Sequence, residues 1–329
     1  MTRREHLKLI MLTSLSIPFA SFSKFNFMID NKTFDVIIVG GSYAGLSAAM
    51  ALGRSLRNVL IIDNGKPCNR QTPYSHNFIT QDGIKPSVIA QKAKEEVLNY
   101  DTIKFLNDFA IRGQKTKNGF EIITENGKKI KSKKLIFSTG IKDTMPEIKG
   151  FSDCWGISVI HCPYCHGFEF KGQKTGIIAN GNTAFHVASL VNNLTDKISI
   201  LTSGKSNFTT EQTEKLKKNN IEIIETEISE IEHNNGNINN VVFKNEKKIN
   251  FDAVYAAIPF VQHSNIPASL GCKLTEQGHI EVDDFQKTSI EGIYACGDNS
   301  TRMRSVANAV ASGNIAGAMT NMELINDNF

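Results

Sequence analysis

A glycine-rich turn between two short apolar strands constrains this chain more than any other feature. The β-branched run 35–39 predicts a buried parallel strand. The turn Gly40–Gly45 follows, and helical periodicity then covers about residues 46–54. A second apolar strand, at 58–62, ends beside Asp63. This order predicts a βαβ unit that binds a dinucleotide.

Each part of the turn has a physical role. Gly40 permits the tight bend, and Gly45 allows the helix to pack closely on the strand. The helix N-terminus presents free N–H groups and a partial positive charge to a pyrophosphate. Ser42 replaces the second motif glycine and crowds the phosphate slightly, a change that Gly41 can absorb. The residues expected to bind the cofactor here are Gly40, Gly41, Ser42, Ala44, Gly45 and Asp63, whose carboxylate suits a ribose hydroxyl.

The second informative motif is Cys162–His166, with the sequence Cys-Pro-Tyr-Cys-His. The Cys-x-x-Cys spacing allows a small-ring disulfide that opens and closes easily. A helix starting near Cys165 would lower a thiol pKa and favour the thiolate, which is the species that attacks a disulfide. Cys162 and Cys165 are therefore expected to form a redox-active pair.

Three other interpretations of this motif were weighed. The string also matches the attachment motif of c-type haem, but the flanking dinucleotide-binding patterns give a haem no role. A structural zinc site needs a second ligand pair, and no other Cys-x-x-Cys occurs in the sequence. The Gly167 turn and the polar neighbours disfavour simple burial of both thiols. We expect no metal here.

A second, degraded dinucleotide turn follows. Residues 174–178 predict a strand, 179–184 give an Ala-x-Gly-x-x-Ala variant that opens a helix, and 197–201 predict the next strand. That strand ends without the acid typical of NAD binding or the arginines typical of NADP binding. Lys205 and Ser203 are the available partners for a 2′-phosphate. Retention of the fold without a bound nicotinamide is the alternative. The expected contacts are Gly181, Ala184 and Lys205.

Near the C-terminus, 291–298 predicts a strand that ends in Gly-Asp. Asp298 could bind ribityl hydroxyls of a flavin. Arg304, Ser305 and Val306 precede a helix of small residues, 307 to about 319, whose N-terminus could stabilise negative charge on a reduced flavin.

The first thirty residues differ from the rest. A charged start that includes Arg3 and Arg4 precedes an apolar stretch, Leu9–Phe22, which is too short for a bilayer span of about 20 residues. This pattern resembles a twin-arginine export signal, with His6 in place of the common Phe. We therefore expect residues 1–30 to be an export signal and the protein to be periplasmic or exported. A disordered leader on a cytoplasmic enzyme is the alternative.

The remaining composition is that of an ordinary globular chain. The net charge of +4 is mild, and the densest lysine run, 128–134, lacks interleaved aromatics. It predicts a solvated face or loop, and no nucleic-acid partner is expected. The four isolated cysteines are expected to be small buried thiols: Cys68, Cys154, Cys272 and Cys296.

With these motifs together, the chain resembles the low-molecular-weight thioredoxin reductases, which are class II FAD-dependent pyridine nucleotide-disulfide oxidoreductases. The resemblance runs from about Asp35 to Ala318 and includes the turn 137–140, where Thr139 and Gly140 are added cofactor contacts. It implies an α/β fold of two Rossmann-like, three-layer domains. The FAD-binding domain comprises 31–144 plus 252–329, and the nicotinamide and redox-disulfide domain, 145–251, is inserted in it.

The resemblance also implies a reaction. In that family a hydride passes from NADPH to FAD, and electrons then pass to the disulfide. Cys165 would face the flavin, and Cys162 would attack the substrate disulfide. The family has Asp after the second cysteine, whereas this chain has His166. Imidazole titrates near neutrality, so His166 could protonate a leaving thiolate or accept a proton from a dithiol.

His166 and the missing arginines are similar to a divergent branch, the gliotoxin-type dithiol oxidases. These oxidise small dithiols and can return electrons to oxygen. Three functions therefore stand: an NADPH-dependent disulfide reductase, an FAD-dependent dithiol oxidase that uses oxygen without a nicotinamide donor, and a non-enzymatic flavin redox sensor or scaffold. The expected partner is a thioredoxin-like protein or a small disulfide or dithiol, and a homodimer is implied by the family.

Overall fold

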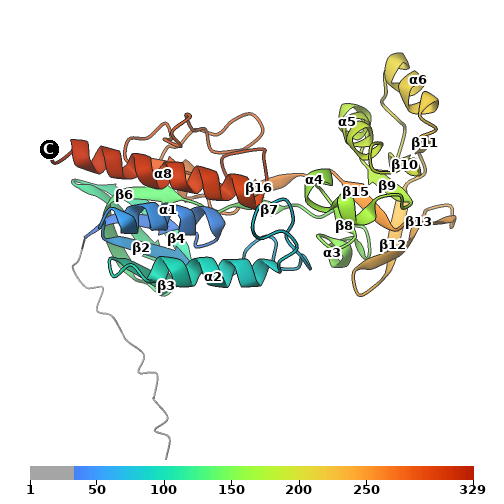
Figure 1. The fold of residues 1–329 in the computed structure, drawn as a ribbon. Helices are drawn as coiled ribbons and strands as arrows, with labels where there is room; N and C mark the ends of the chain where they lie inside the picture. The colour runs from blue at the N-terminus through green and yellow to red at the C-terminus, as the bar shows by residue number, and fades with distance from the viewer. Residues whose placement is uncertain (1–32) are drawn as a thin grey trace, which may run out of the picture. The chain divides into compact units, whose positions relative to one another are not determined.

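The computed structural model describes residues 33–329 of the chain, coloured from blue to red in Figure 1. The expected leader, 1–30, lies outside the described residues. The described part consists chiefly of one mixed and one parallel sheet together with helices, so the predicted α/β class is confirmed.

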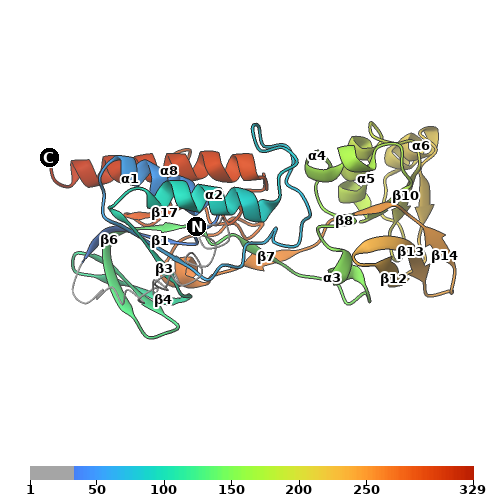
Figure 2. The same ribbon diagram turned by 60° about the horizontal axis from the view of Figure 1, so that its bottom comes forward.

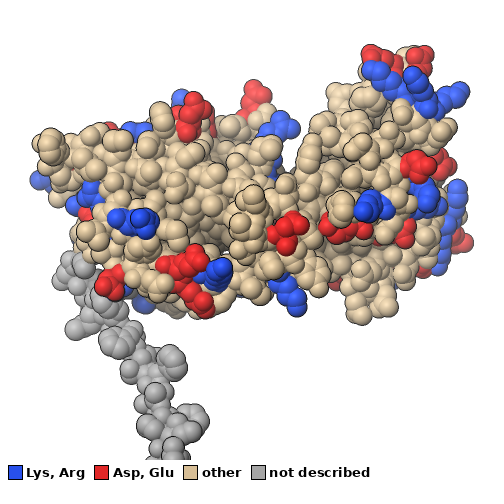
Figure 3. Space-filling model, viewed as in Figure 1, with Lys and Arg blue, Asp and Glu red and all other residues tan. Residues whose placement is uncertain are grey.

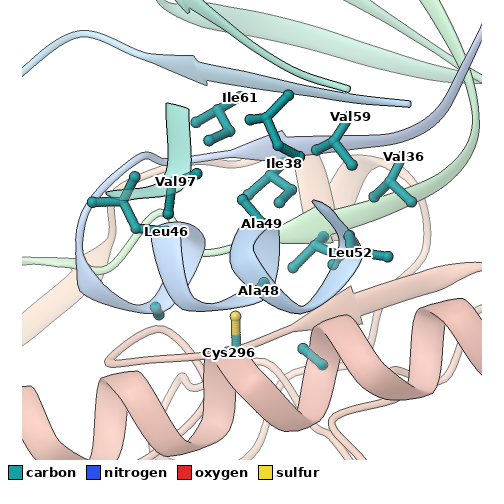
Figure 4. Close-up of a cluster of buried hydrophobic side chains, with 14 of the residues drawn as sticks. Val36, Ile38, Leu46, Ala48, Ala49, Leu52, Val59, Ile61, Val97 and Cys296 are labelled. Atoms are coloured by element: carbon teal, nitrogen blue, oxygen red, sulfur yellow. The ribbon is translucent and has the colours of Figure 1, made fainter. Parts of the chain in front are cut away.

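The first βαβ unit forms as predicted. β1 (Phe34–Val39) pairs in parallel with β2 (Val59–Asp63), and α1 (Tyr43–Arg54) connects them. The helix begins earlier than the periodicity indicates, because Ser42 adopts an extended N-cap conformation directly after the turn. Figure 4 shows how β-branched side chains of the two strands meet small and apolar residues of α1, with Cys296 on the helix's other side.

These strands lie in a seven-stranded sheet within the described residues. Its order is β3-β2-β1-β6-β5-β4, and β17 pairs with β6. Pairing is parallel from β3 to β6 and antiparallel among β4, β5 and β6. The additional strands are β3 (Ile103–Asn107), β4 (Ala110–Thr116), β5 (Gly119–Thr124), β6 (Lys129–Phe137) and β17 (Ile293–Ala295).

The C-terminal helix α8 (Val306–Asn326) extends beyond the predicted end near 319 and lies alongside α1 in both Figure 1 and Figure 2. The two helices approach at backbone distance. A Cβ on Gly313 would lie 2.1 Å from the Ala44 carbonyl oxygen, and one on Gly317 would lie 2.5 Å from that of Ala48. The small residues of α8 therefore fix the chain's C-terminal segment against the first dinucleotide turn. The helix α2 (Pro86–Leu98) also contributes to this core.

A second parallel sheet has the order β11-β10-β9-β15-β8. Its strands are β8 (Val159–Ile160), β9 (Thr175–Ile178), β10 (Ile198–Leu201), β11 (Glu222–Ile224) and β15 (Ala253–Ala256). The helices of this segment are α3 (Phe151–Cys154), α4 (Pro163–His166), the 3₁₀ turn Phe168–Phe170, α5 (Gly181–Val191) and α6 (Thr210–Lys218).

The boundary expected between residues 251 and 252 needs correction. β15 follows that boundary, yet it pairs with β8 and β9 of the second sheet rather than with the first. All four of its residues are buried, and the Val254 side chain packs near Gly176. The second sheet therefore extends through residue 256.

The smaller sheets complete the described architecture. Three antiparallel strands, β12 (Ile228–Asn234), β13 (Asn237–Phe243) and β14 (Lys248–Asn250), form one of them. An antiparallel pair, β7 (Ile141–Asp143) and β16 (Phe260–Gln262), forms the other, and the short helix α7 (Ile266–Ser269) follows it.

The lysine-rich run 128–134 forms the expected solvated face, but most of it is a strand rather than a loop. Residues 129–134 lie in β6 and alternate exposed with buried side chains, so Lys129, Lys131 and Lys133 face outward. Lys134 is the exception, with a side chain only 9% exposed. Its ammonium lies 2.7 Å from Glu323 and 2.8 Å from Asp327, which compensate the buried charge. On the face drawn in Figure 3, acidic and basic side chains are interspersed.

Candidate functional site

The turn between β1 and α1 has room only for glycine at two positions. Gly40 has φ +104°, and a Cβ there would lie 2.3 Å from the Ser138 carbonyl oxygen. A Cβ on Gly45 would lie 1.9 Å from the carbonyl oxygen of Gly40. Because these two glycines have no side chain, the chain can turn tightly here, as the motif predicts.

Gly41 and Asp63 hold the same turn together. The Gly41 N–H donates to Asp63 Oδ2 at 2.7 Å, and the Gly65 N–H donates to Oδ1 at 2.7 Å. A Cβ on Gly41 would lie 2.9 Å from both Asp63 Cβ and a ring carbon of Phe105. Gly41 is therefore required for packing against β2 and β3, a role that differs from the phosphate clearance expected of it.

The N-terminus of α1 is open. Ser42 occupies the N-cap, but its side chain makes no capping hydrogen bond. The first N–H groups of the helix have no intrahelical acceptor, so they remain able to bind an anion. This is the arrangement that a pyrophosphate requires.

A cavity of about 920 Å³ joins this turn to the redox motif. Its lining includes nearly all the residues that the sequence assigns to the first cofactor: Gly40, Gly41, Ser42, Ala44, Asp63, Thr139, Gly140, Asp298, Arg304, Ser305 and Val306. Cys165 and His166 line the same cavity. Four motifs distant in sequence therefore meet at one site, whereas Gly181, Ala184 and Lys205 do not line this cavity.

A buried charge cluster lies in the cavity wall. The Arg304 guanidinium donates to both carboxylate oxygens of Asp143, at 2.9 and 3.1 Å. Burial alone would lower the pKa of Arg304, but these hydrogen bonds outweigh it and raise the pKa. The Trp155 indole N–H also donates to Asp143, at 3.2 Å. Asp143 was missed by the sequence analysis, since the end of a short strand carries no motif.

Asp298 faces the cavity with few partners of its own. Its carboxylate lies 3.7 Å from Arg304 Nε and 3.9 Å from the Cys68 sulfur. Burial raises the pKa of Asp298. Arg304 Nε is buried and has no hydrogen-bond partner among the described residues. These groups remain able to bind a polar ligand in the cavity.

The redox cysteines lie at the start of α4. Cys162 is the N-cap, and Pro163 is the first helical residue, so the helix begins two positions earlier than expected. Both cysteines are free thiols and half-buried. The Cys165 thiol hydrogen-bonds to Cys162 and, with the N–H groups of Tyr164 and Cys165, lowers the pKa of Cys162 to about 7. The same hydrogen bond, together with burial, raises the pKa of Cys165.

The thiol with the lowered pKa is therefore Cys162. A thiolate on Cys162 is the nucleophile that disulfide exchange needs. Cys165 retains its proton and lines the cavity. Cys162 thus has the more acidic thiol and Cys165 lines the cavity, which agrees with the attacking and flavin-facing roles that the family resemblance implies.

Three histidines surround this pair. Burial lowers the pKa of His166, and the nearby His76 lowers it further. Burial and the positive charge of Arg304 lower the pKa of His161 to about 4. His161 immediately precedes the motif, and its position was an available signal. His76 lies in the loop between β2 and α2, where nothing in the sequence marks it.

The second dinucleotide turn differs from the first in its helix cap. At the N-terminus of α5, Asn180 Oδ1 accepts hydrogen bonds from the N–H groups of Gly181 and Asn207, both at 2.8 Å. Asn180 Nδ2 donates to the Lys205 carbonyl oxygen at 2.9 Å. The loop after β10 is therefore bonded to the turn where a nicotinamide dinucleotide would place its phosphates. Ala184 is fully buried and packs in the core of this segment.

The isolated cysteines follow the expectation with one correction. Cys154, Cys272 and Cys296 are buried, but Cys68 is exposed and lines the cavity. The atoms crowded around the Cys68 sulfur nevertheless desolvate it, and this effect and Asp298 raise its pKa to about 11. It therefore stays protonated at neutral pH.

No group of three or more potential ligands is arranged to hold a metal ion among residues 33–329. Over the same residues, no helix combines the length and apolar character needed to cross a membrane.

The described residues fit an adenine dinucleotide that carries a flavin. The open α1 terminus suits a pyrophosphate, and the buried Asp298 carboxylate suits a ribityl hydroxyl. The cavity volume lies within the range of cofactor sites. Fold and site together define a dinucleotide-binding disulfide redox protein.

Comparison with known proteins gives the family. The sequence pattern of the pyridine nucleotide-disulphide oxidoreductases matches residues 34–313. A thioredoxin reductase named tcpT from Claviceps purpurea is 28% identical over 91% of this chain and 97% of its own length. The crystal structure of an oxidoreductase from Agrobacterium tumefaciens is 32% identical, with TM-score 0.84 over 90% of this chain and 99% of that one.

A putative thioredoxin reductase from Bacillus anthracis is 29% identical, with TM-score 0.86 over 90% of this chain and all of its own. The chain belongs to the pyridine nucleotide-disulphide oxidoreductase family. It is an oxidoreductase similar to the thioredoxin reductases, a class that uses FAD and NADPH. The predicted family, fold class and enzyme class are thereby confirmed.

Proposed function

We propose that the chain passes electrons between NADPH, FAD and the Cys162–Cys165 pair and delivers them to a disulfide substrate. One observation carries the proposal. Cys165 and His166 line the same cavity as the α1 turn, Asp298 and Arg304. Electron exchange between a flavin and a thiol pair requires this proximity.

The residues that would hold FAD are those of the α1 turn, with Asp63, Asp298, Arg304 and the α8 N-terminus. When bound, FAD supplies a carrier for two electrons. The protein's own chemistry is thiol exchange. The Cys162 thiolate attacks one substrate sulfur, and the other substrate sulfur leaves and takes a proton from solvent. Cys165 passes its proton to the neutral His166 imidazole and displaces the first sulfur, so the substrate is reduced as the Cys162–Cys165 disulfide forms.

A second function is favoured by the closed turn at α5. The Asn180 side chain bonds to the loop after β10, and no arginine occurs among residues 202–205 to hold a 2′-phosphate. An enzyme without a nicotinamide donor would run the exchange in reverse. A substrate dithiol would reduce the Cys162–Cys165 disulfide, and the electrons would pass through FAD to oxygen.

Anaerobic titration of the purified flavoprotein distinguishes the two functions. NADPH is added first and flavin absorbance is followed, with NADH as a parallel donor. Bleaching by NADPH supports the reductase. Bleaching by a dithiol such as dithiothreitol, without bleaching by either nucleotide, contradicts the reductase and supports the oxidase. A Cys162→Ser variant serves as the control, because dithiol-driven bleaching must be lost in it.

The substrate class and the oligomeric state are further parts of the proposal. Tyr164, between the two cysteines, and Phe168, three residues after Cys165, have side chains that are 71% and 67% exposed, which suits a thioredoxin-like protein or a small apolar disulfide or dithiol. A homodimer is proposed from the family alone, and light scattering of the purified protein tests it.

Export is proposed from Arg3, Arg4 and the apolar stretch 9–22, with cytoplasmic retention as the alternative. Cell fractionation of the full chain tests this, compared with a variant in which both arginines are lysine. Equal distribution of the two between fractions contradicts twin-arginine export.

A further inference from the structure

The loop between β2 and α2 brings a histidine to the redox motif from a distant part of the sequence. The loop is closed on itself, since the Ser75 N–H donates to the Ile84 carbonyl at 2.8 Å and the Gly83 N–H donates to the Ser75 carbonyl at 2.9 Å. His76 follows this closure, and its side chain is only 19% exposed. Its position is therefore set by the loop's backbone.

Both ring nitrogens of His76 face carboxylates. Nδ1 lies 3.6 Å from Asp82, and Nε2 lies 3.5 Å from Glu169. Asp82 is held in turn by the Asn77 N–H at 2.8 Å. The two carboxylates thus lie on opposite sides of the imidazole, one at each ring nitrogen. Asp82 belongs to the same loop, whereas Glu169 follows the redox helix.

The His76 ring also meets the ring of His166. Their centroids are 6.3 Å apart, and the planes are nearly perpendicular at 88°. At this distance a proton on one imidazole disfavours a proton on the other. His166 thus contacts a neighbouring imidazole and shares its short helix with Cys165.

We propose that His76 is a positioning residue that keeps His166 in its neutral, proton-accepting form during thiol exchange, with Glu169 acting in the opposite sense. The proposal rests on the proposed function, because it assigns a regulator to the same reaction. His76 acts on His166 through charge across the ring contact.

Several other charged and titratable groups lie near His166. On its own helix are Cys162 and Cys165, and His161 precedes that helix and interacts with His166 electrostatically. Glu169 lies on the following 3₁₀ turn and favours protonation of His166. Arg304 faces Cys162, Cys165 and His161 from the cavity wall. His76 is thus the group of the β2–α2 loop that opposes a proton on His166.

The size of the effect follows from the ring separation. A unit charge 6.3 Å away shifts a titration by roughly 0.5 to 2 pH units for effective dielectric constants of about 80 to 20. Removing a positive His76 should therefore raise the midpoint of His166 by this amount.

The test is histidine-selective NMR titration of the FAD-loaded, full-length protein, with the His166 resonance assigned by its loss in His166→Asn. We expect His76→Asn to raise the His166 midpoint by roughly 0.5 to 2 units. Glu169→Gln, made in the His76→Asn background, should lower it again. Asp82→Asn should cause a smaller rise, because it weakens the anchoring of His76. His186→Asn, an exposed histidine on α5, is the matched control and should leave the midpoint unchanged.

An unchanged midpoint in His76→Asn overturns the proposal, as does a shift equal to that of the control. Flavin content checks that each variant is folded. If His76→Asn loses FAD, the Asp82→Asn variant replaces it: a rise of the His166 midpoint supports the proposal, and an unchanged or lower midpoint overturns it. The acidic limb of the pH–rate profile for dithiol exchange should move with the NMR midpoint. The titration needs no turnover, so a failed NADPH or dithiol assay would contradict the proposed function without affecting this result.

Discussion

The hydrogen bond between the two redox thiols gives the sharpest prediction about reactivity. Cys165→Ala removes the donor that stabilises the Cys162 thiolate, whereas Cys165→Ser keeps a donor at the same place. A hydrogen bond to a charged group contributes about 1.5–3 kcal/mol. This corresponds to a rise of roughly 1–2 units in the pKa of Cys162 in the alanine variant, since a pKa unit equals about 1.4 kcal/mol.

The assay is the rate of iodoacetamide alkylation of reduced protein as a function of pH. Peptide mass spectrometry separates Cys162 from the exposed Cys68, whose raised pKa keeps it slow near neutrality. We expect the Cys165→Ala profile to lie on the alkaline side of the Cys165→Ser profile. Coincident profiles would refute the reasoning, because they would show that the helix N–H groups alone lower the pKa of Cys162.

Three further predictions concern the scaffold. Gly45→Ala should lose FAD, measured as flavin absorbance per protein, because its Cβ would lie 1.9 Å from a carbonyl oxygen; Ser42→Ala should retain it, since that side chain caps nothing. Asn180→Ala should lower the unfolding free energy in urea by about 1 kcal/mol through loss of the α5 cap, and an unchanged midpoint contradicts this. Burial alone would raise the pKa of Glu323, but hydrogen bonds, chiefly from Lys134, lower it from 4.5 to about 2. Its stabilising contribution is therefore complete above pH 4.5 and lost as pH falls toward 2. Urea unfolding across this window should show a weaker pH dependence in Glu323→Gln, and equal dependence would count against the ion pairs.

The elements that sequence predicts well are those fixed by local sterics. The β1–α1 turn follows from the glycines at 40 and 45. Only glycine fits there, because a Cβ at either position would collide with nearby backbone atoms. The start of α4 was readable too, because Pro163 directly after Cys162 is a typical first helical residue. The expectation of a helix near Cys165 overlooked that signal and so placed the helix start two residues too late.

Contacts between segments far apart in sequence were not predictable. Asp143 and Arg304 are 161 residues apart, and neither position has a motif that names the other. His76 meets His166 only because the loop before α2 folds back on itself. Lys134 was assigned to a solvated run, since its two acidic partners lie near the C-terminus. In each case the partner is supplied by the tertiary fold.

The boundary near residue 252 was misplaced for a similar reason. The run 253–256 is short and apolar, so its composition cannot show which of two parallel sheets it joins. Its pairing with β9 shows that it belongs to the second sheet.

The central claim is that Cys162 and Cys165 exchange electrons with the flavin. Anaerobic reduction with dithionite tests it directly, by counting the equivalents needed to reduce the oxidised protein fully. We expect the wild-type protein to take up twice the equivalents of a Cys162→Ser variant, because the disulfide accepts as many electrons as the flavin. Equal uptake by the two proteins would contradict the claim.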